Sequence, residues 1–389
     1  MINAIAIANY RSLLDFSVAL GPLNVITGPN GCGKSNVYRA LRLLAETAHG
    51  GVIQSLAREG GLPSTFWAGP GTISRGMRAG EVPVQGTVSD GPARLRLGFA
   101  GEDFGYTISL GLVPPGSLGP TAFELDPEIK RETIFSGAFY RPSAALVDRT
   151  AAIAKVRQGR SWQVVAQHLP MFESLFNHLA DPSQAPEVLR VRDAVGGWRF
   201  YDHFRADAEA PARQAQLGTR TTVLDDEGSQ LAAALQTIRE IGDDDALDEA
   251  IDDAFPGAKL DIDVSSDHRF AVSLHQPGLL RPLSGLELSD GTLRFLLWVA
   301  VLLTPRPPPL IVLNEPETSL HPDLLPALSR LIRRAAEHSQ LIVVSHATRL
   351  VAGIEKDERC HSIALDKHLG QTQVLGQGML DEPAWEWPD

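Results

Sequence analysis

Residues 28–35, Gly-Pro-Asn-Gly-Cys-Gly-Lys-Ser, have the phosphate-binding spacing G-x-x-x-x-G-K-S. Glycines in such a loop let backbone N–H groups close around phosphate oxygens, and a helix beginning there adds positive partial charge. Lys34 supplies a formal charge to the β and γ phosphates, and the Ser35 hydroxyl is placed to ligate Mg²⁺. The apolar run 23–27 predicts a buried strand before the loop, and residues 36–44 predict an amphipathic helix after it. We therefore expect a nucleoside triphosphate site rather than a simple glycine turn.

A second group of residues that could take part in catalysis lies at 310–315, where four apolar residues precede Asn314 and Glu315. In phosphate-loop ATPases a core strand of this kind delivers a magnesium-associated group and then a carboxylate that polarises the attacking water. We expect Glu315 to be this general base. An aspartate is usual where Asn314 stands, and an amide brings no negative charge, which predicts weaker metal affinity and slow turnover. A buried strand that merely ends in a turn would show the same pattern.

Two further segments could contact phosphate. Residues 288–292 precede a predicted helix, so Ser289 or Asp290 is expected to cap it, and Ser289 with Gly291 would also form an anion site. His346 follows a predicted buried strand, which places it at the carboxyl edge of the sheet, where nucleotide sites lie. A lone histidine is more often an ordinary surface or core residue, but in this position it is a candidate γ-phosphate contact.

In this order, the four elements resemble the ATP-binding-cassette head of the RecF and SMC class. Residues 288–292, LSDGT, stand where the signature LSGGQ is common, and residues 315–322, EPETSLHP, resemble the Walker B end and D-loop of stand-alone RecF-like ATPases. These ATPases are also related to the ATPase half of the OLD-family nucleases. Ser345-His346 matches the switch histidine, and residues 9–12, NYRS, match the N-x-R-S opening of the class. The resemblance covers roughly the first and last thirds of the chain.

The resemblance implies a homodimer that pairs head-to-tail, with ATP and Mg²⁺ held between the phosphate loop of one copy and Ser289 of the other. Hydrolysis by Glu315 would then reopen the dimer, which would act on DNA or on a DNA-processing partner. No glutamine is assigned to the Q-loop. The implied catalytic residues are Lys34, Ser289, Glu315 and His346; the implied nucleotide contacts are Arg11, Asn30, Gly31, Cys32, Gly33, Lys34, Ser35, Asn36, Ser289 and Gly291; the implied metal contacts are Ser35 and Asn314.

The rest of the chain predicts the elements that position these groups. Residues 4–7 and 16–20 suggest a hairpin, and strand-like runs between 72 and 112 suggest an antiparallel sheet. Apolar residues recur at helical spacing over 165–179, although Pro170 should kink or divide that helix. Further helices near 231–238 and 247–255 complete what we predict to be a compact helical insertion. A hairpin is expected at 260–274. Helices at 292–304 and 322–338 then alternate with strands at 310–313 and 341–344, which implies a mostly parallel sheet.

These elements define an α/β P-loop NTPase of the ABC-ATPase head type with an antiparallel β subdomain and a helical insertion. The expected domains are a first lobe over 1–138, the helical insertion over 139–257, and a second lobe over 258–389. About 40 residues follow His346, too few for the nuclease domain of the OLD enzymes, so we expect no nuclease here. The chain also lacks a heptad run that could build the coiled coil of SMC proteins.

Composition narrows the class of protein. Of 389 residues, 43% are hydrophobic and 21% charged, as in a soluble globular protein. The apolar run 295–303 is too short to span a bilayer, and no secretory signal is present, so we expect a cytoplasmic protein without a membrane partner. Two cysteines, Cys32 and Cys360, cannot build a disulfide framework. The net charge is −12, yet residues 139–220 contain 11 basic and 8 acidic residues, which allows a local basic face.

Three other functions fit parts of this pattern. A sensor or regulatory subunit of an anti-phage defence or toxin-effector complex would use the same ATPase motifs to control a separate effector. The nucleotide-binding subunit of a transporter is disfavoured by the N-x-R-S opening, the central insertion and the run at 315–322. A small-molecule kinase would leave the signature and the switch histidine unexplained.

Overall fold

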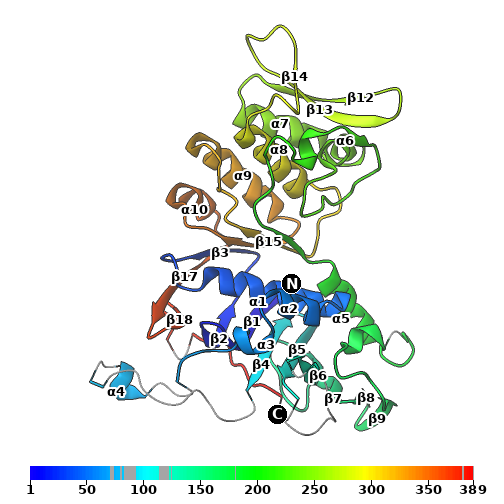
Figure 1. Cartoon of the computed structure of the whole chain (residues 1–389), viewed down its shortest axis with the longest axis vertical. Coiled ribbons are helices and arrows are strands. Elements are labelled where there is room, and N and C mark those ends of the chain that lie inside the picture. The colour runs from blue at the N-terminus through cyan, green and yellow to red at the C-terminus, as the bar shows by residue number, and fades with distance from the viewer. Residues whose placement is uncertain are drawn as a thin grey trace. The chain divides into compact units, whose positions relative to one another are not determined.

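The computed structural model describes residues 1–70, 74–78, 81–82, 93–113, 122–123, 125–179, 181–378 and 381–388. The chain divides into two compact units (Figure 1). Unit 1 comprises residues 1–21, 28–198 and 363–389, and unit 2 comprises residues 22–27 and 199–362. The predicted division into three domains, with boundaries at 138/139 and 257/258, stays a prediction. The boundaries of the two compact units fall at other residues.

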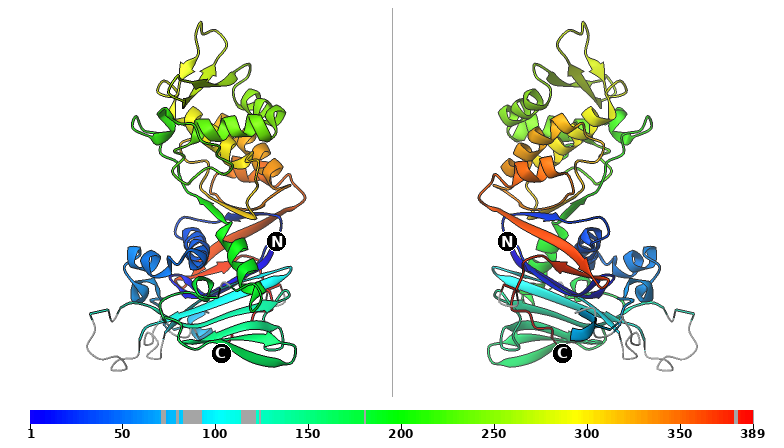
Figure 2. Two further views of the ribbon diagram at one scale, coloured as in Figure 1. Left: turned by 90° about the vertical axis from the view of Figure 1, so that its right-hand side faces the viewer. Right: turned by 90° about the vertical axis from the view of Figure 1, so that its left-hand side faces the viewer.

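Unit 1 contains an antiparallel sheet in which the strands at 2–10 and 104–111 are mostly buried, whereas the edge strand at 161–166 is mostly exposed. The described strands follow the order β2-β1-β4-β5-β6-β7-β8-β9, and Figure 2 shows β4 to β9 in cyan and green side by side. The predicted opening hairpin is confirmed, since Tyr10 pairs with Leu13 across the turn. The strand bounds are β1 Ile2–Tyr10, β2 Leu13–Ala19, β4 Arg94–Gly101, β5 Phe104–Gly111, β6 Glu128–Ser136, β7 Ala145–Thr150, β8 Ile153–Gln158 and β9 Ser161–Ala166.

The antiparallel sheet predicted between residues 72 and 112 is confirmed for β4 and β5; residues 71–73, 79–80 and 83–92 lie outside the described residues. The helix predicted over 165–179 is wrong. Its first residues belong to β9, whose backbone pairs with β8, and a short turn of 3₁₀ helix, η1 (Leu175–Asn177), follows. Pro170 lacks the N–H that a continuous helix would require there. The segment 139–166, expected to be helical, instead extends the sheet through β7 to β9.

The helices of unit 1 include the predicted helix after the phosphate loop, which is confirmed as α1. Helices α1 and α5 pack on each other and against strands of the sheet. The bounds are α1 Lys34–His49, α2 Val52–Arg58, α3 Leu62–Thr65, α4 Arg75–Arg78 and α5 Pro186–Gly196. A C-terminal hairpin follows, with β17 at Cys360–His368 and β18 at Gln371–Val374; the division between the units falls within β17.

Unit 2 is built on parallel strands, as the alternation of strand and helix predicts. Four strands follow the order β10-β15-β16-β3, and each neighbouring pair is parallel. A smaller antiparallel sheet contains the hairpin predicted at 260–274, which is confirmed. The bounds are β3 Leu23–Thr27, β10 Arg199–Tyr201, β11 Gln216–Leu217, β12 Lys259–Val264, β13 Arg269–His275, β14 Leu283–Ser284, β15 Leu310–Asn314 and β16 Gln340–Val344.

One apolar cluster joins these strands to the helices of unit 2, which Figure 1 shows gathered beyond β3 and β15. The helices predicted near 231–238, 247–255, 292–304 and 322–338 are confirmed within a few residues at their ends. The bounds are η2 Pro211–Arg213, α6 Leu231–Ile241, α7 Asp244–Ala254, α8 Asp290–Leu302, η3 Pro322–Leu324, α9 Leu325–Ala335 and α10 Thr348–Ile354. Within the described ranges, no helix has the length and apolar character needed to cross a bilayer.

Candidate functional site

The phosphate loop has the backbone that its glycines permit. Gly28 and Gly33 have φ values of 145° and 113°, which residues with a Cβ rarely adopt. A Cβ at Gly33 would also collide with the Thr372 hydroxyl. The ammonium of Lys34 lies inside the loop, where it donates to the carbonyl oxygens of Gly28 at 2.6 Å and Pro29 at 3.2 Å. The positively charged Lys34 side chain thus lies where the sequence pattern predicts phosphate oxygens.

The other loop residues divide by exposure. Asn30, Gly31 and Ser35 are exposed, so the Ser35 hydroxyl, at the second residue of α1, is open to a ligand. Cys32 is buried, and its carbonyl accepts from Thr372 Oγ1 at 2.6 Å.

Two hydroxyl groups, those of Ser12 and Thr372, connect the phosphate loop to two other segments of the chain. Ser12 Oγ and Thr372 Oγ1 are 2.6 Å apart, and Asn36 Nδ2 donates to Ser12 Oγ at 2.7 Å. Because Thr372 also donates to Cys32, this chain of hydrogen bonds ties the N-terminal hairpin, the C-terminal hairpin and the loop together within unit 1. Ser12, the serine of the N-x-R-S opening, is therefore linked to the backbone of the loop through Thr372.

Arg11, in the turn of the first hairpin, forms an ion pair with Glu59 at 2.8 Å. Tyr10 donates to the same carboxylate at 2.7 Å. Burial and the neighbouring carboxylate raise the pKa of Tyr10 well above its usual range. The pKa of Arg11 is also raised, because its hydrogen bonds to Glu59 and Tyr10 outweigh the larger single effect of burial, which lowers it. The assignment of Arg11 to the nucleotide stays a prediction.

In unit 2, the carboxyl ends of the parallel strands lie at one edge of the sheet. Leu313 pairs with Tyr201, and Val344 pairs with both Asn314 and Ile26. The residues that follow the strands, 202, 315 and 345–346, therefore emerge at this edge, and residue 28 follows β3 directly along the chain. Ligands of parallel α/β sheets bind at such edges.

Glu315 and His346 meet there. His346 Nδ1 lies 3.6 Å from Glu315 Oε1, and the two side chains are 51% and 40% exposed, so both can reach a ligand. Glu315 has a φ of 49°, and its N–H donates to the carbonyl of Val344 at 2.8 Å. A left-handed conformation at a non-glycine residue costs about 1–3 kcal/mol and is typical of functional positions.

Glu317 holds the loop that bears the histidine. Its Oε1 accepts from Ser345 Oγ at 2.7 Å and from the N–H groups of His346 and Ala347 at 3.0 and 3.2 Å. The same oxygen lies 3.4 Å from His346 Nδ1, and the Glu317 side chain is only 6% exposed. A buried carboxylate thus fixes the backbone on which the histidine is mounted.

Asn314 has a side-chain oxygen that could contact a metal ion. Its Oδ1 is buried and has no hydrogen-bond partner among the described residues, while its Nδ2 donates to Asp202 Oδ1 at 2.9 Å. An oxygen free to accept is what Mg²⁺ or a water bound to it requires, and the exposed Ser35 hydroxyl offers another such oxygen. Among the described residues, no group of three or more His, Cys, Asp or Glu could cage a metal alone. Mg²⁺ that accompanies a nucleotide is usually held by one or two protein oxygens together with the phosphates.

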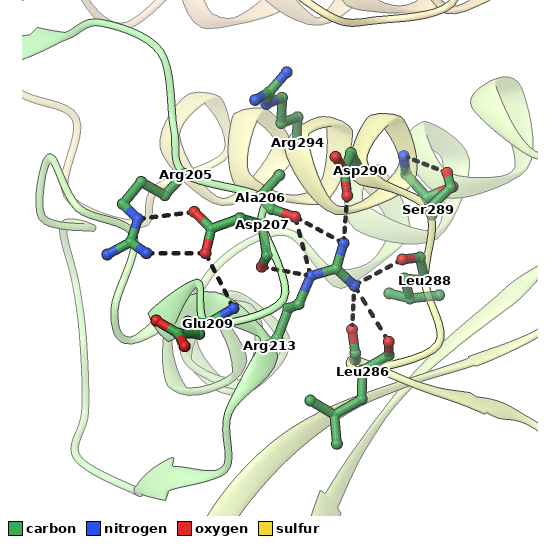
Figure 3. A network of polar contacts seen from close by, with 12 residues as sticks. Arg205, Ala206, Asp207, Glu209, Arg213, Leu286, Leu288, Ser289, Asp290 and Arg294 are labelled. Atoms are coloured by element: carbon green, nitrogen blue, oxygen red, sulfur yellow. Dashed lines mark hydrogen bonds and ion pairs between the residues drawn. The ribbon is translucent and has the colours of Figure 1, made fainter.

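The signature loop is exposed, and hydrogen bonds anchor it on both sides of Ser289. Ser289 caps α8, as predicted, and its Oγ accepts from Thr292 N at 3.1 Å. Below it the buried guanidinium of Arg213 donates to the carbonyls of Gly285 and Leu288 at 2.9 and 2.7 Å and to Asp290 Oδ1 at 2.6 Å (Figure 3). Ser289 itself stays exposed beside Gly291. No hydrogen bond of the described residues joins Ser289 to Glu315 or His346.

Four residues of these clusters do not stand out in the sequence. Glu317 lies in the EPETSLHP run, so its spacing could have drawn attention to it. Arg213, Asp202 and Thr372 had no such signal, since each reaches its partner from more than 70 residues away along the chain.

Known proteins resemble this chain in sequence and in fold. Residues 23–352 match the family described as "AAA domain, putative AbiEii toxin, Type IV TA system". A 44-residue stretch is 43% identical to the OLD nuclease of Thermus scotoductus, covering 11% of this chain and only 8% of that protein.

Among solved structures, the SMC head bound to the C-winged helix domain of ScpA aligns with a TM-score of 0.52 at 12% identity, over 97% of this chain and 98% of that chain. The SMC head domain from Thermotoga maritima aligns with a TM-score of 0.47 at 12% identity, over 97% and 99%. The SMC-head fold expected from the sequence is thereby confirmed. Because the family match spans most of its length, this chain belongs to the family described as "AAA domain, putative AbiEii toxin, Type IV TA system", and it has the fold of an SMC head.

Proposed function

We propose that the protein hydrolyses ATP and uses the reaction as a switch. The observation that carries this proposal is the pair Glu315 and His346 at the carboxyl edge of the parallel sheet, with Glu317 fixing the loop of the histidine. The phosphate loop binds the triphosphate through its N–H groups and Lys34. Glu315 takes the proton of the attacking water, and His346 donates a hydrogen bond to the γ-phosphate. Mg²⁺, when bound with ATP, supplies charge that offsets the phosphate oxygens.

The substitution Glu315→Gln tests the base. We expect phosphate release to fall about 100-fold or more, because a general base contributes at least that factor. Binding of a fluorescent ATP analogue should stay within about twofold of the unmodified protein. Glu337→Gln is the matched control, since Glu337 is an exposed carboxylate in the same unit, 3.8 Å from Arg359. Unchanged hydrolysis in Glu315→Gln would remove Glu315 from the mechanism, and absence of ATP binding by the unmodified protein would end the proposal.

We further propose that ATP closes a homodimer through Ser289. The residue is exposed on a loop to which Arg213 donates hydrogen bonds, so it is accessible to a second copy. Sedimentation of Glu315→Gln should show a dimer with ATP and a monomer without it. Ser289→Arg in the same background should abolish the dimer and keep ATP binding. A protein that binds ATP and stays monomeric contradicts the clamp.

Action on DNA, or on a DNA-processing partner, is supported by the likeness to SMC heads and to an OLD nuclease rather than by a surface of this chain. Several arginines of the segment 139–220 are already engaged: Arg149 and Arg213 are buried, Arg205 pairs with Asp207, and Arg220 pairs with Glu240. Duplex DNA binding with ATP present should weaken steeply with salt. Undetectable binding would leave a protein as the partner.

Control of a separate effector is the second candidate, and the family description, which names a putative toxin, favours it. Here the same ATP-dependent dimer would hold or release the effector. Co-expression with the products of neighbouring genes, followed by purification with and without ATP, distinguishes this function from action on DNA. A stable complex whose effector is released on hydrolysis supports it.

A further inference from the structure

Asn314 and Asp202 lie side by side at the carboxyl edge of the sheet in unit 2. Strand β10 is parallel to β15, and Tyr201 pairs with Leu313, so the next residue of each strand end is Asp202 on one and Asn314 on the other. Asn314 Nδ2 donates to Asp202 Oδ1 at 2.9 Å. The Asp202 side chain is 47% exposed, and His203 Nδ1 lies 3.7 Å from its Oδ1. The carboxylate therefore faces solvent beside an amide.

The direction of the amide follows from this contact. An asparagine has a donor end and an acceptor end, and the carboxylate of Asp202 can accept only from the donor end. The hydrogen bond therefore turns Asn314 Oδ1 away from Asp202, into a buried position where no described residue donates to it. A buried acceptor without a partner destabilises the folded state, unless a ligand or water supplies the donor or cation.

We propose that Asp202 supplies the negative charge that Asn314 lacks, so that the two side chains together serve the divalent cation of the nucleotide. This inference rests on the proposed ATP site. Asn314 offers its amide oxygen, and Asp202 offers a carboxylate one strand away, directly or through a water bound to the cation. Because Asp202 is half-exposed, its charge is kept without the large desolvation cost of a buried carboxylate. Slow turnover, expected when Asn314 is considered alone, does not follow.

A purely structural role for Asp202 makes a different prediction. If the carboxylate only orients Asn314, an amide oxygen at position 202 would do so equally well. Asp202→Asn keeps an acceptor for Asn314 Nδ2 and removes only the charge. The substitution therefore separates the electrostatic role from the positioning role.

The experiment measures Mn²⁺ bound to the complex with a non-hydrolysable ATP analogue, by electron paramagnetic resonance. Asp202→Asn should weaken Mn²⁺ binding about tenfold or more, the loss typical of outer-shell partners of a metal site. Binding of the analogue in EDTA should stay within about twofold, because the phosphate loop does not use Asp202. Asp261→Asn is the charge-matched control on β12, where Asp261 is exposed and pairs with His275.

The double substitution Asp202→Asn with Asn314→Asp returns the carboxylate to the neighbouring strand and should restore most of the Mn²⁺ affinity. Asp202→Asn with unchanged Mn²⁺ affinity, or a double variant as weak as the single one, overturns the assignment of charge to Asp202. Those results leave the ATPase proposal standing if the unmodified protein binds nucleotide and metal. Failure of the unmodified protein to bind the analogue at all ends both proposals.

Discussion

Two buried carboxylates of this protein are used in opposite ways. In unit 1, Glu132 pairs with the fully buried Arg149 at 2.8 Å and also accepts from Tyr106, Ser174 and the N–H of Leu175. Both of its oxygens are engaged. In unit 2, Glu317 receives all its hydrogen bonds on Oε1, and Oε2 has no partner among the described residues. Its ionic neighbour, His346, is half-exposed.

We interpret the Glu132–Arg149 pair as structural and propose that the Glu317–His346 pair serves the candidate site. Arg149 also donates to the carbonyls of Ala151, Pro170 and Glu173, so the first network fixes the segment after β9 onto the sheet. Burial, and then the Glu132 charge, raise the pKa of Tyr106 well above its usual range, which keeps that hydroxyl a donor. In the second network Glu317 Oε2 accepts no hydrogen bond from a described residue, and the neighbouring His346 is accessible to solvent. Unsatisfied buried polar atoms of this kind are common at functional sites.

The largest effect expected from this comparison is on stability. Arg149→Met should lower the free energy of unfolding by about 3–5 kcal/mol, because it leaves the Glu132 charge buried without its partner. Urea denaturation measures the loss. Arg131→Met is the matched control on the same sheet; its pair with Asp148 is partly exposed, and the substitution should cost about 1 kcal/mol or less. Equal losses would show that burial does not distinguish the pairs.

Glu317→Gln should act mainly on catalysis. The amide keeps an acceptor for Ser345 and the two N–H groups but weakens three charge-assisted hydrogen bonds, so we expect a loss of about 1–2 kcal/mol in stability. Loosening the loop of His346 should lower kcat about tenfold or more, with a smaller change in KM. Steady-state kinetics and urea denaturation measured together decide the point. A stability loss as large as that of Arg149→Met with unchanged kcat would make Glu317 a structural residue like Glu132.

The smallest effect concerns an exposed carboxylate beside the signature loop. Hydrogen bonds from Arg281, and then from Ser284, lower the pKa of Glu287 to about 2. A depressed pKa stabilises the folded state above the usual glutamate pKa, and this contribution is lost as the pH falls toward 2. Glu287→Gln should therefore be slightly less stable than the unmodified protein at neutral pH, and the gap should close between about pH 4.5 and 2. A gap independent of pH would show that charge is not involved.

Local chemistry explains what sequence reasoning predicts here. The backbone angles of the loop at 28–35 favour glycine at Gly28 and Gly33. The apolar periodicity on either side predicts the flanking strand and helix, and the Ser289 hydroxyl predicts the helix cap. The parallel sheet of unit 2 also follows, since strand and helix alternate there. The prediction fails over 139–179, where a chance helical spacing of apolar residues competes with β pairing that depends on strands distant in the sequence.

The sequence by itself determined which residues are expected to bind phosphate and which strand ends carry the candidate base and histidine, because these predictions depend on neighbours in the chain. Only the tertiary structure decided which charges stand beside them. Asp202 reaches Asn314 across 112 residues, and Arg213 reaches Leu288 across 75. Such partners are set by strand order and register, which bring distant residues to one edge of a sheet without leaving a local pattern in the sequence. The charge balance at Asn314, and with it the expected metal affinity, is a property of the fold.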